Sequence, residues 1–163
     1  MIVLVSSPEG PALAWLTDHH GVYVLQQPRA VYTVRDGDEI KGVYVITWRN
    51  DATAELHVYG TVTPATTRAL FALAFVGHRL HRLEVITSRE NRQIRRAAPK
   101  MGFRFECVLK DYYGPGQDGF LYAMTPGECR WIKGGTDGID VQSTGTDGPD
   151  GADDAGDGAT ALS

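Results

Sequence analysis

The chain has 163 residues, of which 42% are hydrophobic and 22% are charged, enough for one domain with a buried core. No run of 18 apolar residues occurs, so the sequence predicts no membrane-spanning helix. The N-terminal stretch MIVLVSSPEG lacks the basic region and long apolar segment of a signal peptide, and we expect a cytoplasmic protein. The two cysteines, Cys107 and Cys129, form no CxxC pair, so neither a disulfide framework nor a metal site is predicted.

Charge is distributed unevenly along the chain. Residues 134–163 contain seven Asp and eight Gly, with no Lys, Arg or aromatic residue. This composition cannot bury enough apolar surface to offset the entropy of ordering, so it predicts a disordered acidic tail. The predicted folded domain, residues 1–133, holds all 16 Lys and Arg against 13 acidic residues, a net charge of about +3. That value fits an ordinary soluble surface, and it also suits an anionic ligand.

The first half of the chain reads as one helix followed by short strands. After the apolar run Ile2–Val5, the Ser-Pro-Glu triplet that ends at Glu9 is typical of a helix start, and this helix is expected to end near His20. Strand-like runs rich in β-branched and aromatic residues then occupy residues 22–25, 30–34, 41–48 and 54–60. The Asp-Gly and Asn-Asp turns between the later runs favour antiparallel hairpins, so we expect a three-stranded meander.

The second half alternates helices and strands. A helix is predicted over 63–78, where Thr63 and Pro64 resemble a helix cap, and a buried strand over 82–88. A second helix starts at residue 91, and a hairpin follows over 103–125. This order predicts an α/β (α+β) fold with a mixed sheet, in which an antiparallel meander precedes strand–helix crossovers and helices cover the sheet faces.

The helix from residue 91 and the hairpin after it resemble the GNAT acyltransferase superfamily, most closely the branch that acetylates the N-termini of ribosomal proteins. The helix positions that match in register are Asn91, Arg96, Ala98, Lys100, Gly102 and Phe103. Asp118 and Trp131 extend the match, and the resemblance covers roughly residues 40–131. A weaker resemblance to divergent phage-borne members extends the expected location to the cytoplasm of a bacterium or of a phage-infected host.

This resemblance implies both a fold and an activity. In GNAT proteins two central parallel strands splay apart, and the thioester of acetyl-CoA lies in the V-shaped gap between them. An amine attacks the thioester directly, a base takes its proton, and backbone amides hold the developing oxyanion. The resemblance therefore implies an N-acetyltransferase whose acceptor is an amine of a protein, a small molecule or a nucleobase.

The loop that should hold the cofactor's pyrophosphate departs from the family pattern. GNAT proteins place a Gly-rich loop at the N-terminus of the helix after the fourth strand, where free amides favour negative charge. This chain has no glycine between Gly60 and Gly77, and Pro64 removes one amide. Hydroxyls and one guanidinium group are predicted to replace the missing donors. The predicted pyrophosphate residues are Val62, Thr63, Thr66, Thr67 and Arg68.

Candidate catalytic residues lie on the strand at 54–60. Glu55, His57 and Tyr59 alternate with apolar residues and should point to one face, which in a GNAT fold borders the gap. The ordinary pKa of histidine suits His57 to proton transfer near neutral pH. Ser88, at the end of the next predicted strand, is a further candidate. The alternative interpretation is a solvated strand face with polar cross-strand pairs.

The helix that begins near Asn91 carries the remaining candidates. By the resemblance, Asn91 contacts the pantetheine arm of the cofactor, and Asn is also well suited to cap a helix. Arg92 and Arg96 belong to a basic cluster over residues 79–104 that could bind the cofactor's phosphate or a nucleic-acid backbone. A solvated helix face is the alternative.

Three functions remain open from the sequence. The first is acetyl transfer from acetyl-CoA to an amine. The second is a phage-type GNAT-fold enzyme that modifies nucleobases by other chemistry, and the third is a non-catalytic binding protein on the same scaffold.

Overall fold

A computed structural model describes residues 1–6, 9–22, 27 and 29–133 of the chain. The predicted acidic tail at 134–163 lies outside these residues. The elements, in chain order, are β1 (Ile2–Ser6), α1 (Glu9–His20), β2 (Arg29–Asp36), β3 (Glu39–Trp48), β4 (Thr53–Gly60), α2 (Pro64–Ala72), a π-helical turn η1 (Leu73–Gly77), β5 (Arg82–Ser88), α3 (Arg92–Met101), β6 (Arg104–Gly114) and β7 (Gln117–Met124). Within the described residues, no helix is long and apolar enough to cross a membrane.

The strands form one seven-stranded sheet in the order β1-β2-β3-β4-β5-β7-β6. Neighbouring strands are antiparallel except β4 and β5, which run parallel. The parallel pairing lasts for three residue pairs only, from Thr53 with Arg82 to Glu55 with Glu84. Beyond that point β4 continues to Gly60 and β5 to Ser88, but the two strands no longer pair with each other. The predicted mixed sheet with splayed central parallel strands is therefore confirmed.

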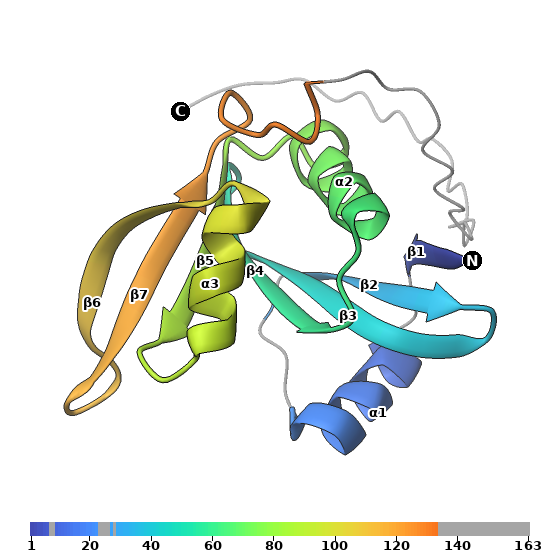
Figure 1. Ribbon diagram of the computed structural model, residues 1–163, viewed down its shortest axis with the longest axis horizontal. Helices are drawn as coiled ribbons and strands as arrows, with labels where there is room; N and C mark the ends of the chain where they lie inside the picture. Colours follow the sequence, from blue (N-terminus) through green and yellow to red (C-terminus); the bar gives the residue numbers. More distant parts are fainter. Residues whose placement is uncertain (7–8, 23–26, 28, 134–163) are drawn as a thin grey trace, which may run out of the picture.

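Helices cover both faces of the sheet, as predicted (Figure 1). Ala12 and Leu16 of α1 pack against Val31, Val43 and Val45 on one face. The opposite face packs against α2 and α3. Alternate residues of β2 and β3 thus supply two separate apolar layers, which follows from the two-residue period of a strand.

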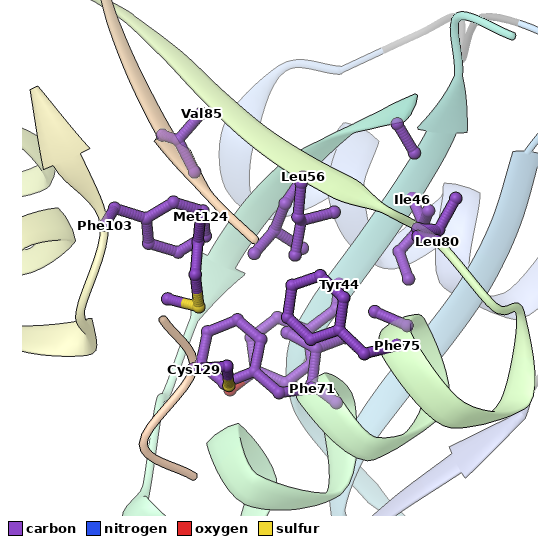
Figure 2. Close-up of a cluster of buried hydrophobic side chains, with 14 of the residues drawn as sticks. Tyr44, Ile46, Leu56, Phe71, Phe75, Leu80, Val85, Phe103, Met124 and Cys129 are labelled. Carbon is purple, nitrogen blue, oxygen red and sulfur yellow. The ribbon is translucent and has the colours of Figure 1, made fainter. Parts of the chain in front are cut away.

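The larger core lies between the sheet, α2 and α3. Figure 2 shows Tyr44, Ile46 and Leu56 of the sheet converging with Phe71 and Phe75 of the helical layer. All five side chains are buried, and each contributes roughly 1.5–3 kcal/mol of hydrophobic stabilisation. This core spans the point where β4 and β5 separate.

Three segments differ from the sequence expectation. The apolar run at the N-terminus forms β1, which pairs with β2 as an edge strand. Residue 22 is not in a strand, and the rest of the strand predicted at 22–25 lies outside the described residues. The helix predicted over 63–78 ends as a π-helical turn, in which the His78 amide bonds the carbonyl of Leu73 at 2.7 Å.

Candidate active site

A cleft of about 1600 Å³ opens where β4 and β5 diverge. One wall is β4, and the other combines the end of β5 with one side of α3. The N-terminus of α2 and two tyrosines of β6 also line the cleft. Backbone pairing is absent along this gap, so the cleft is a direct consequence of the short parallel pairing.

The predicted row Glu55, His57 and Tyr59 lines the cleft. Tyr59 packs with the α1 layer, whereas Leu56 and Val58 pack on the opposite face, so the row shares one side of β4. The Glu55 side chain is 9% exposed and that of His57 is 34% exposed. The Nε2 atom of His57 lies 3.8 Å from Oε1 of Glu55.

A ladder of alternating glutamates and arginines runs from the cleft across the sheet. Arg49 donates from Nη2 to Oε2 of Glu55 at 2.5 Å, and its Nε lies 3.3 Å from Oε2 of Glu84. Arg82 continues the ladder, because its Nε lies 2.6 Å from Oε1 of Glu84 and its Nη2 lies 2.5 Å from Oε2 of Glu106. Sequence reasoning missed Arg49, whose role depends on partners brought together only by the β4–β5–β6 arrangement. The ladder crosses the sheet where the parallel strands still pair.

Burial shifts the pKa of both His57 and Tyr59. The pKa of His57 is lowered from its ordinary 6.5, first because burial disfavours the charged ring and then because Arg49 repels it, while Glu55 acts in the opposite direction. His57 is therefore mainly neutral near pH 7 and able to accept a proton. Burial, followed by the charge of Glu55, raises the pKa of Tyr59, which stays protonated.

Two adjacent tyrosines of β6 face the same cleft. The rings of Tyr112 and Tyr113 meet edge to face at 4.9 Å, and both side chains are exposed. Arg49 donates to the Tyr112 hydroxyl at 3.3 Å. Partial burial, then the neighbouring Tyr112, Glu55 and Tyr59, raise the pKa of Tyr113 to about 12. The cleft thus carries aromatic rings and hydroxyl donors opposite β4.

Ser88 and Asn91 also line the cleft, at the turn between β5 and α3. Asn91 is the N-cap of α3, and its Oδ1 accepts from the Ile94 amide at 3.2 Å. Its side-chain amide nitrogen is not engaged in that bond. Asn91 therefore both caps α3 and lines the cleft.

The predicted pyrophosphate residues divide into two groups. Val62, Thr63 and Thr67 line the cleft, whereas Thr66 and Arg68 are not among its lining residues. Thr66 is buried, and its hydroxyl bonds Tyr44 at 3.1 Å.

A capping box occupies the N-terminus of α2. Oγ1 of Thr63 accepts from the Thr66 amide at 3.2 Å, and the Thr63 amide donates to the Thr66 hydroxyl at 3.0 Å. The Thr67 amide bonds the Thr63 carbonyl at 2.9 Å, and Pro64 has no amide hydrogen. Among the described residues, the amides of Val62 and Ala65 form no hydrogen bond at this helix start, and of the two only Val62 lines the cleft.

Arg92 and Arg96 lie elsewhere. They line a second hollow with Arg95 and Tyr122, and neither contributes to the cleft. In the described part of the chain, no group of three or more His, Cys, Asp or Glu residues is arranged to hold a metal ion.

No family model and no curated protein matches the sequence. Solved structures do match the fold. A mutant form of the spermidine N-acetyltransferase SpeG from Vibrio cholerae is similar with a TM-score of 0.64 and 14% identity, over 81% of this chain and 96% of that one. A GNAT-family protein from Desulfovibrio desulfuricans gives a TM-score of 0.58 and 17% identity, over 77% and 99% of the two chains. The chain therefore has a GNAT-like fold.

Proposed function

We propose that the chain is an acyl-CoA-dependent N-acyltransferase that moves an acetyl group from acetyl-CoA to an amine. The observation that carries the proposal is the cleft between the splayed β4 and β5, with the neutral imidazole of His57 on its β4 wall. The GNAT fold supports acyl transfer in general. The ribosomal-protein branch and a phage origin are finer proposals that rest on the sequence resemblance.

The residues present fit the two ends of acetyl-CoA unequally. Asn91 and Ser88 place polar groups along the cleft for an amide-rich pantetheine arm. The start of α2 offers the amide of Val62 to a pyrophosphate, with the Thr63 hydroxyl beside it. Acetyl-CoA would supply the acetyl group as an activated thioester.

His57 is the favoured general base. Its lowered pKa leaves the ring free to accept the proton of an attacking amine. Glu55 is bound by Arg49, so we assign it the role of holding His57 and Arg49 in place. Tyr59 stays protonated and can donate a hydrogen bond, and Ser88 is a polar group at the opposite wall.

Calorimetry with the full chain and acetyl-CoA tests binding, and release of free thiol in the presence of amines tests transfer. The amine panel comprises a polyamine, peptides with free N-termini and nucleosides. We expect binding heat, thiol release with one class, and a loss of roughly 100-fold or more in kcat for His57→Gln. Absence of both binding heat and a thermal shift with acetyl-CoA would contradict the proposal.

A specific observation favours a second candidate. The capping box at α2 and Pro64 together leave fewer amides for a pyrophosphate than a Gly-rich loop provides. This N-terminus of α2 is consistent with a GNAT-fold protein that modifies nucleobases by other chemistry, or with one that binds a partner without catalysis. Mass spectrometry of nucleosides from DNA co-expressed with the protein would reveal a new adduct in the first of these cases.

A further inference from the structure

A hollow of about 300 Å³ on α3 is separate from the cleft. It is lined by Arg92, Arg95, Arg96 and Tyr122, and none of these residues lines the cleft. The cleft uses another side of the same helix, where Ala97 is one of the lining residues. Helix α3 therefore divides two surfaces with different chemistry.

The three arginines of this hollow carry uncompensated charge. Among the described residues, no carboxylate lies within ion-pair distance of them, whereas Arg49, Arg82 and Arg104 each pair with a glutamate. They occupy positions i, i+3 and i+4 in the first half of a helix that has no acidic residue in its first turn. Like charges at this spacing repel, and positive charge at a helix N-terminus opposes the helix dipole. A bound anion would relieve both effects.

The guanidinium group of Arg95 is held in place before any ligand binds. It lies over the ring of Phe120 at 4.5 Å, and its Nη1 donates to the Arg89 carbonyl at 2.9 Å. Its Nε is buried and has no hydrogen-bond partner within the described part of the chain. Fixing a guanidinium in this way lowers the entropy cost of binding an anion.

An exposed aromatic ring adjoins the arginines. Phe105 is 48% exposed, and its ring centroid lies 6.1 Å from that of Phe120 and 5.5 Å from that of Tyr122. Phe105 is therefore continuous with both the ring beneath Arg95 and the floor of the hollow. An exposed ring beside the fixed Arg95 and two further guanidinium groups offers a stacking surface next to hydrogen-bond donors for phosphate.

We propose that this surface, which we call the arginine groove (Arg92, Arg95, Arg96, Phe105 and Tyr122), binds single-stranded nucleic acid. Phosphates contact the guanidinium groups, and one base stacks on Phe105. Single-strand binding sites combine these two features, and stacking tolerates any base because every base has a flat face. The groove does not depend on acetyl-CoA binding in the cleft.

Fluorescence anisotropy of a labelled oligothymidylate and oligouridylate with the full chain, over a series of salt concentrations, tests the proposal. Arg92→Gln/Arg96→Gln should flatten the slope of log K against log salt by about 1.4, because each single-strand phosphate contact contributes about 0.7. Phe105→Ala should weaken binding about tenfold, and Phe105→Trp should preserve it.

The matched control is Arg79→Gln/Lys133→Gln, which removes the same charge from exposed positions that do not line the hollow. Melting curves establish that each variant is folded. Absent oligonucleotide binding at low salt, or equal losses in the control and the groove variant, would overturn the proposal. Binding of inorganic phosphate as tight as that of the oligonucleotide, with no effect of Phe105→Ala, would identify a simple anion site and overturn it as well.

Discussion

The protonation of His57 depends on neighbours that act in opposite directions. Burial and Arg49 both lower its pKa, and Glu55 raises it. The positive charge of Arg49 repels a proton on His57. Arg49 also binds Glu55 at 2.5 Å, which offsets the negative charge that would attract that proton. Arg49 is a positioning residue, since it acts through His57 and Glu55.

Replacing Arg49 by Gln should raise the pKa of His57. A protonated ring cannot accept a proton. As pH is lowered, the activity of the variant should therefore begin to fall at a higher pH than that of the natural chain. NMR titration of the His57 ring measures the change directly. Arg35→Gln, on β2, is the control, because Arg35 bonds Thr33 and Asp38 instead of the row on β4. An unchanged His57 titration would contradict this account.

His78 should make stability depend on pH. Its Nε2 bonds the Tyr32 hydroxyl at 2.5 Å, its ring meets Trp48 edge to face, and burial lowers its pKa below 6.5. The folded state then binds fewer protons than the unfolded state, so stability is lost as pH falls from about 6.5 towards the lower folded value.

Urea unfolding at several pH values should therefore show a shallower loss below pH 6.5 for His78→Gln than for the natural chain. The lowered carboxylate pKa values, such as that of Glu106, act only below about pH 4.5, so the two ranges are separable. An equal slope in both proteins would exclude His78 as the source.

Strands β3 and β4 approach closely at the end that borders the cleft. A Cβ at Gly60 would lie 2.5 Å from the Lys41 carbonyl and 2.8 Å from the Trp15 ring, and Gly60 has φ +77°. Only glycine adopts this conformation at low cost. At this end β4 still pairs with β3, although its pairing with β5 has ended at Glu55.

Gly60→Ala should lower the free energy of unfolding by about 2–4 kcal/mol, because it combines a backbone clash with positive φ. The control is Gly10→Ala in α1, where a Cβ meets nothing within 4 Å. That change should stabilise by about 0.5–1 kcal/mol, as alanine favours a helix. Urea unfolding measures both, and equal effects would contradict the argument.

Elements with a clear local pattern could be predicted from the sequence, and contacts between distant elements could not. The alternation of Glu55, His57 and Tyr59 is a local pattern, and it correctly predicted that the three side chains share one face of their strand. The ladder through Arg49 requires the pairing of β4 with β5, which no local pattern encodes. The sequence predicts that Thr66 faces phosphate, but this residue is buried, and its hydroxyl bonds Tyr44 and the Thr63 amide of the capping box.

On the scale of the whole molecule, few backbone contacts join the two parts of the sheet. Strands β1–β4 and strands β5–β7 meet through the three residue pairs between β4 and β5. The amides of His81 and Arg82 also bond the Ala52 carbonyl. Side chains add the core beneath the gap and the ion pair of Arg49 with Glu84. The two walls of the cleft therefore come from two contiguous stretches of chain, β4 from the first and β5 with α3 from the second.

This division has a consequence for chain connectivity. Everything from β1 to η1 comes from residues up to Gly77, and everything from β5 to β7 from residues after Arg79. A break at exposed Arg79 should therefore yield two fragments that reassemble through the core, with fewer hydrogen bonds to restore than a break within either half. Co-expression of the two fragments, followed by co-purification on a tag carried by one, measures this reassembly.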